Sequence, residues 1–114
     1  MATYHFTQGD QRPAISAYLE DAYGRAIPLP TSVSFVMRDR RSSAVKVNGA
    51  ATIENLTVGD DSRVKVTYSW ASTDLDSAGE FLCEWRCTFA DGTQMTVPNG
   101  TFDVVRVKPK VDVA

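Results

Sequence analysis

Apolar and polar residues alternate along several short segments of this chain, and this pattern constrains the fold more than any other feature. Such alternation is typical of β-strands with one face toward a core and the other toward water. It does not suit helices, and no window of eleven residues shows a convincing helical repeat. The apolar positions of these segments are Ile15, Ala17 and Leu19; Val33, Phe35 and Met37; Val64, Val66, Tyr68 and Trp70; and Phe81, Cys83, Trp85, Cys87 and Phe89.

Turn-forming residues separate the alternating segments. Asn-Gly and Asp-Gly pairs favour tight hairpin turns because they tolerate positive φ. About seven or eight short antiparallel strands with such turns between them predict an all-β fold, a β-sandwich. At most, residues 72–78 form one helical turn, capped by Ser72 or Thr73. The predicted turns lie at residues 21–24, 39–43, 48–49, 59–62, 90–93 and 98–100.

The length of 114 residues predicts a single domain over residues 1–114. Residues 1–7 and 108–114 are expected to extend beyond the compact strands as short arms. Neighbouring chains would hold these arms through added strands, and the alternation of Val111 and Val113 with Asp112 suits strand addition. Packing of both arms within the chain is the alternative.

Charge and hydropathy argue against two classes of partner. Twelve Lys and Arg residues against fourteen Asp and Glu residues give a net charge of −2, without the basic excess of a nucleic-acid binder. No apolar run approaches the roughly 18 residues of a membrane span. The first six residues lack the basic and apolar regions of a secretory signal, so we expect a soluble protein that is made in the cytoplasm.

The two cysteines are expected to be small core residues without a disulfide. Cys83 and Cys87 lie on one predicted strand, where four residues separate them by about 13 Å. A disulfide needs Cα atoms within about 7 Å. His5 is the chain's one histidine and no second cysteine pair exists, so we expect no metal site and no cofactor.

Catalysis is not expected either. Asp74 and Asp76 are candidates for an acid–base pair, or for calcium ligands together with Asp60 and Asp61. A calcium site needs six to eight oxygens in a shaped loop, and the sequence has no such loop motif. Turn and capping roles are therefore favoured for these aspartates, and the chain is predicted not to be an enzyme.

Three groups of residues are candidates for binding a partner. Arg38, Arg40 and Arg41 form the densest positive charge and would suit an acidic partner surface, a phosphate or a sugar acid; a solvated hairpin end is the alternative. Tyr18 points away from the core by alternation and Tyr23 lies in a turn, and exposed tyrosines are favoured at interfaces. The third group lies in the C-terminal arm and comprises Lys108, Lys110, Val111 and Val113.

Two stretches carry a resemblance to known families. Residues 76–83, with Phe81 two residues before Cys83, resemble the corner that opens strand F of immunoglobulin-type domains. A longer series of segments comprises Gly9-Asp10 with Pro13, the turn at 21–24, Ile27-Pro28-Leu29, residues 33–38, Tyr68-Ser69-Trp70, residues 74–81 and Phe89-Ala90-Asp91-Gly92. The order of these segments, over roughly residues 6–107, resembles the N-terminal immunoglobulin-like domain of tailed-phage baseplate upper proteins.

This resemblance implies an immunoglobulin-like β-sandwich and a structural role in a virion. The expected function is a protein-binding scaffold module of the tail or baseplate, present in multiple copies in a symmetric assembly and bound to other virion proteins. A capsid or neck decoration protein on the particle exterior is an alternative. A module that binds host glycans is a further alternative, which would require an exposed aromatic platform.

Overall fold

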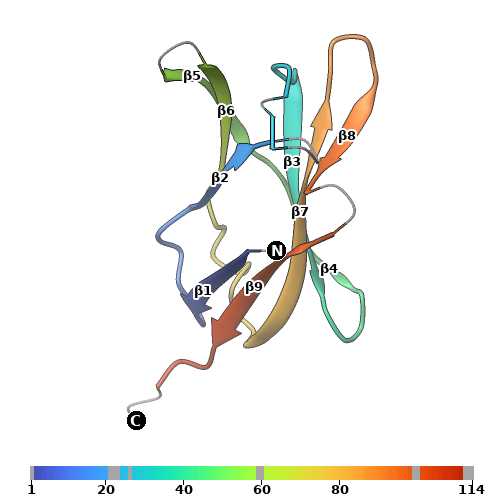
Figure 1. Cartoon of the computed structure of the whole chain (residues 1–114). Coiled ribbons are helices and arrows are strands. Elements are labelled where there is room, and N and C mark those ends of the chain that lie inside the picture. Colours follow the sequence, from blue (N-terminus) through green and yellow to red (C-terminus); the bar gives the residue numbers. More distant parts are fainter. Residues whose placement is uncertain (1, 21–23, 26, 59–60, 99–100, 112–114) are drawn as a thin grey trace.

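The computed structural model describes residues 2–20, 24–25, 27–58, 61–98 and 101–111, and the side chains of residues 57, 58, 61 and 62 are outside this description. These residues form nine strands in two sheets (Figure 1). The larger sheet has the order β1 (Thr3–Thr7), β9 (Asp103–Lys108), β7 (Gly79–Thr88), β3 (Ser32–Asp39) and β4 (Val45–Ala50), with β8 (Gln94–Val97) also paired to β7. The smaller sheet has the order β2 (Ile15–Leu19), β6 (Asp61–Tyr68) and β5 (Thr52–Val58).

The all-β prediction is confirmed, and the fold is an immunoglobulin-like β-sandwich without a disulfide. The predicted number of strands is too low by at least one, and one pairing is not antiparallel. β1 runs parallel to β9, with Thr3 opposite Val104 and Thr7 opposite Lys108. The expected N-terminal arm is therefore wrong for residues 3–7, which belong to the larger sheet and place Phe6 in the core.

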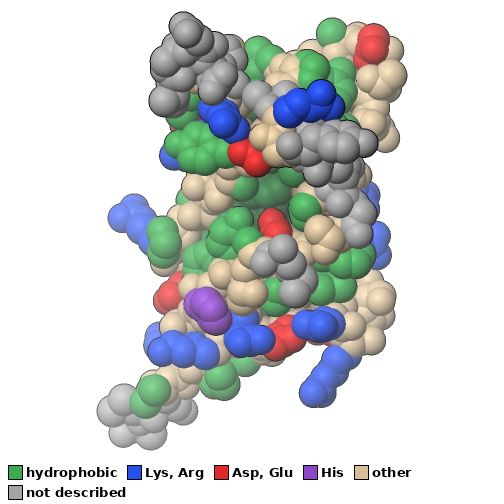
Figure 2. All heavy atoms as spheres, in the orientation of Figure 1, with side chains coloured by type: hydrophobic (Ala, Val, Ile, Leu, Met, Phe, Trp, Pro, Cys, Tyr) green, Lys and Arg blue, Asp and Glu red, His purple; other side chains and the backbone are tan. Residues whose placement is uncertain are grey.

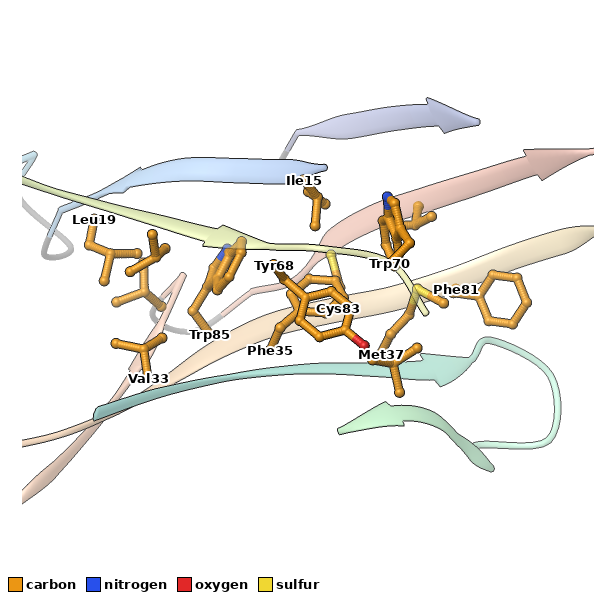
Figure 3. Packing of buried hydrophobic residues seen from close by; sticks show 14 of the residues in the cluster. Ile15, Leu19, Val33, Phe35, Met37, Tyr68, Trp70, Phe81, Cys83 and Trp85 are labelled. Atoms are coloured by element: carbon orange, nitrogen blue, oxygen red, sulfur yellow. The ribbon is translucent and has the colours of Figure 1, made fainter. Parts of the chain in front are cut away.

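The alternating segments were assigned to the correct faces. Their apolar side chains meet between the sheets, as Figure 3 shows for residues of β2, β3, β6 and β7. Phe35 lies at the centre of an aromatic cluster, with ring centroids 5.1 Å from Tyr68, 5.6 Å from Trp70 and 4.8 Å from Trp85. Val36 is an exception, because it is buried although alternation places it on the opposite face of β3 from Phe35.

The cysteines are buried, unpaired core residues on β7, as predicted. Burial raises the pKa of Cys83 to about 12, with smaller contributions from Asp103 and Glu84. Burial likewise raises the pKa of Cys87 to about 11. Both thiols therefore stay protonated near neutral pH, which makes them poor nucleophiles.

Asn48-Gly49 was predicted to form a turn, and this prediction is wrong. Both residues belong to β4, where Gly49 lies opposite Phe35. The glycine is needed for packing, because a Cβ atom at this position would lie 2.6 Å from Cε1 of Tyr68. Tyr68 comes from the smaller sheet, so the absent side chain lets the two sheets approach where the chain passes from β4 to β5.

Replacing Gly49 with alanine is expected to lower the free energy of unfolding by about 1–3 kcal/mol, the usual cost of overpacking. The Tyr68 ring cannot move away freely, because it stacks on Phe35 and its hydroxyl is hydrogen-bonded to Asp74. Urea denaturation measures the change. Asn48→Ala on the same strand is the control, since Asn48 is exposed, and should stay within about 0.5 kcal/mol of the parent. Equal stability of both variants would contradict this account of the glycine.

Within the described ranges, no helix is long and apolar enough to cross a membrane.

Candidate partner-binding site

Three segments that are distant in sequence line an open depression of about 800 Å³. They are the hairpin after β3, the start of β7 and the end of β9, contributing residues 39–41, 78–80 and 106–109. Strand pairing brings them together, because Asp39 of β3 lies opposite Phe81 of β7 and Gly79 of β7 lies opposite Val107 of β9. The depression therefore forms because β7 lies between β3 and β9 in the larger sheet.

The β3–β4 hairpin is held by its first residue. Asp39 Oδ1 accepts hydrogen bonds from the backbone N–H groups of Arg41, at 2.8 Å, and Ser42, at 3.0 Å. These bonds, from Ser42 first and then Arg41, lower the pKa of Asp39 below its ordinary value. Ser43 adopts φ 62°, which closes the turn. The predicted turn at residues 39–43 is confirmed, and its geometry fixes the backbone from which Arg40 and Arg41 project.

Glu80 joins two arginines at the edge of the depression. Arg40 Nη1 donates to Glu80 Oε2 at 2.8 Å, and Arg106 donates from Nη2 at 2.7 Å and from Nε at 3.1 Å to Oε1. The bonds from Arg106, followed by those from Arg40, lower the pKa of Glu80. All three side chains are exposed to water, so the network contributes little to stability. Its main effect is to orient the two guanidinium groups.

The lining carries an excess of positive charge. Four basic residues (Arg40, Arg41, Arg106 and Lys108) and two acidic residues (Asp39 and Glu80) give +4 − 2 = +2, on a chain whose net charge is −2. In the described part of the chain, no ion pair is found for Arg41 or Lys108. Figure 2 shows Lys and Arg side chains along the lower end of the molecule, where Figure 1 places the ends of β1 and β9.

A smaller depression of about 300 Å³ lies on the other side of β9. It shares Arg106 and Lys108 with the first, and β1 contributes His5 and Thr7 to its lining. The parallel pairing of β1 and β9 explains this neighbourhood, because His5 lies opposite Arg106 and Thr7 opposite Lys108. The outward side chains of β9 therefore present positive charge to both sides.

The structure brings together some of the predicted binding residues. Arg40, Arg41 and Lys108 line the larger depression, whereas Arg38 does not; its Nη1 donates to the carbonyl of Ser43 at 3.3 Å. Tyr18 is 54% exposed, as alternation predicted, but it lies on the smaller sheet with the Lys65 ammonium 6.0 Å from its ring centroid.

The remaining predicted residues belong to the C-terminal segment or fall outside the description. The Lys110 N–H donates to Gln8 Oε1 at 3.4 Å, and Val111 is 79% exposed. Figure 1 shows this segment leaving the sandwich after β9. Tyr23 and Val113 lie outside the described residues.

Two residues of the site, Glu80 and Arg106, were missed by the sequence reasoning. Each is a charged residue next to buried apolar ones, Phe81 for Glu80 and Val105 and Val107 for Arg106. That pattern marks both as outward-facing on strands. It does not indicate that the strands are neighbours, and this pairing is what joins Arg106 to Glu80.

Asp74 and Asp76 have structural contacts rather than a common site. Asp74 is 8% exposed and accepts hydrogen bonds at Oδ2 from the Tyr68 hydroxyl, at 2.6 Å, and the Ala71 N–H, at 2.8 Å. Asp76 is exposed and forms an ion pair with Lys46. Among the described residues, no group of three or more His, Cys, Asp or Glu side chains is placed to hold a metal ion.

Comparisons with known proteins support the fold and no more. No protein-family model matches the chain, and no curated protein matches its sequence. One solved structure that is similar is CopC from Methylosinus trichosporium OB3b, with 14% sequence identity and a TM-score of 0.50, over 100% of this chain and 91% of that one. At this identity the likeness shows the β-sandwich alone.

Proposed function

We propose that the chain is a protein-binding scaffold module of a phage particle, located on the tail or baseplate. The observation that carries the proposal is the depression at the end of β9, where three segments present Arg40, Arg41, Arg106 and Lys108 beside an exposed C-terminal segment. The order of strand and turn segments, which resembles that of the baseplate domain named above, supports the location.

The mechanism is passive binding. Each copy presents the charged depression and residues 109–111, which directly follow β9, to a neighbouring protein. Exposed ion pairs are individually weak, about 0–1 kcal/mol each. Many copies on one symmetric scaffold add avidity, so weak contacts suffice.

A capsid or neck decoration protein would use the same surface with a different partner. The burial of both tryptophans counts against the glycan-binding alternative. It needs an aromatic platform, but Trp70 and Trp85 are 5% and 1% exposed. We also infer a non-enzymatic role, since the charged groups of the depression bind one another or face water and Cys83 and Cys87 are buried.

Cross-linking mass spectrometry on intact particles tests the proposal. We expect Lys108 and Lys110 to give links to tail-tip or baseplate proteins, because both are exposed at the proposed contact. Lys65, on the outer face of the smaller sheet, is the internal control and should give fewer links. Links to the major capsid protein would instead indicate a decoration protein on the head of the particle. Absence of the chain from purified particles would overturn the proposal.

A further inference from the structure

We propose that the larger depression binds a carboxylate-rich segment of a partner protein, which Arg41 and Lys108 contact directly. Arg40 and Arg106 would border the bound segment, in orientations held by Glu80. This inference deepens the proposed function and rests on it for the existence of a protein partner. It adds the chemistry of the partner and the residues that select it.

Glu80 demonstrates which chemical group the depression accommodates. Its carboxylate lies between two guanidinium groups, with three N–O distances from 2.7 to 3.1 Å on the Arg106 and Arg40 sides. Guanidinium groups bind carboxylates well because their fork of donors matches the two carboxylate oxygens. An acidic side chain from a partner would meet the same kind of donors on Arg41, and an ammonium on Lys108.

Arg41 and Lys108 are the cations available for this contact. Both are exposed, and both line the depression. Arg41 is drawn toward Asp39 by charge, but the Asp39 Oδ1 atom is occupied by backbone N–H groups of the turn. Arg40 and Arg106 already share Glu80. A partner carboxylate therefore gains most from Arg41 and Lys108.

An acidic protein segment fits this surface better than a nucleic acid does. Asp39 and Glu80 lie within the lining, and a continuous run of phosphates would pass close to both. A peptide can place its carboxylates over the cations and its backbone over the acids. Ala78 and Pro109, which are both exposed, add apolar surface for the stems of its side chains.

Fluorescence anisotropy with a dye-labelled hexaglutamate peptide tests the inference on the purified chain. We expect saturable binding at low ionic strength that weakens as salt is added, because exposed charges are screened. The double variant Arg41→Ala/Lys108→Ala should weaken binding by about fivefold to tenfold, from two exposed ion pairs. The matched control, Lys65→Ala/Arg86→Ala, removes the same charge from residues outside the depression and should bind much more like the parent.

Glu80→Gln tests whether the Glu80 carboxylate affects peptide binding, which a purely structural role of Glu80 would leave unchanged. It removes a negative charge from the lining and frees Arg40 and Arg106, so we expect hexaglutamate to bind several-fold more tightly. Weaker binding by this variant would show that Arg40 and Arg106, paired with Glu80, hold the peptide in place of Arg41 and Lys108, and would contradict the inference. Equal loss in the two double variants would show that only net charge matters, and would overturn the inference, as would no binding by the parent.

Binding of single-stranded DNA with the same charge as the peptide tests whether the depression prefers a nucleic acid. Tighter binding of DNA than of hexaglutamate at equal ionic strength would make this a nucleic-acid surface and overturn the inference. Failure here differs from failure of the proposed function. Links from Lys108 to virion proteins without peptide binding would leave the scaffold role standing, whereas peptide binding by a chain absent from particles would leave only the acidic-segment site.

Discussion

Replacing Trp85 with alanine is expected to lower the free energy of unfolding by about 3–5 kcal/mol, as for large aromatic residues removed from a core. The Trp85 side chain is 1% exposed, and its ring centroid lies 4.8 Å from that of Phe35 at an interplanar angle of 56°. Its removal leaves a cavity between the sheets and takes away an aromatic contact from Phe35 (Figure 3). Domains of this kind have about 5–15 kcal/mol of stability, so much of it would be lost.

Thermal and urea denaturation followed by circular dichroism measure this loss. Arg86→Ala is the matched control, because Arg86 is the next residue of β7 and its exposed side chain faces outward, where it forms an ion pair with Glu84. We expect this control to melt close to the parent. A Trp85→Ala variant that kept the parental melting temperature would contradict the inward placement of Trp85. Such a result would mean that the inward-facing and outward-facing residues of β7 are assigned one position out of register.

The faces of the strands are the part of the fold that the sequence predicts best. Alternation places Phe35, Tyr68 and Trp85 inside because β-strands have a side-chain period of two, whatever the order of strands in the sheet. Strand order is not contained in this local pattern. The parallel pairing of β1 with β9 joins residues about 100 positions apart, and nothing within residues 3–7 alone indicates it.

The candidate site was predictable only in part, for the same reason. Arg40 and Arg41 were found because they are adjacent in a turn, and Lys108 because it begins the C-terminal segment. Glu80 and Arg106 complete the site through β7–β9 pairing, which places Glu80 opposite Arg106. A contact set by strand order has no local signal.

Asn48-Gly49 shows how a correct general rule can fail. The pair favours tight turns, yet the turn before β4 is made by Asp39 and Ser43, and Gly49 serves the approach of the two sheets. Both uses exploit the missing side chain. Only knowledge of Tyr68 on the facing sheet distinguishes them.

Replacing Asp74 with alanine is expected to lower the free energy of unfolding by about 2–3 kcal/mol, because it removes two hydrogen bonds that a buried side chain accepts. Asp74 Oδ2 accepts from the Tyr68 hydroxyl and from the Ala71 N–H, so two donors lose their partner. Burial, followed by the hydrogen bond to Asp74, raises the pKa of Tyr68, so that its hydroxyl remains a donor. The aspartate thus ties the turn after β6 to the aromatic cluster of the core.

A double-mutant cycle with Tyr68→Phe separates this bond from the turn contact. Tyr68→Phe removes the hydroxyl and keeps the ring, so the two variants should be coupled by about 1 kcal/mol or more if the hydrogen bond holds the turn to the core. Asp76→Ala is the control within the same turn region and should have little effect, because its ion pair with Lys46 is exposed to water. Additive losses from Asp74→Ala and Tyr68→Phe would assign the stabilisation to the Ala71 N–H alone. In that case Asp74 would cap the turn without connecting it to Tyr68, and the tight packing at Gly49 would depend on stacking with Phe35 by itself.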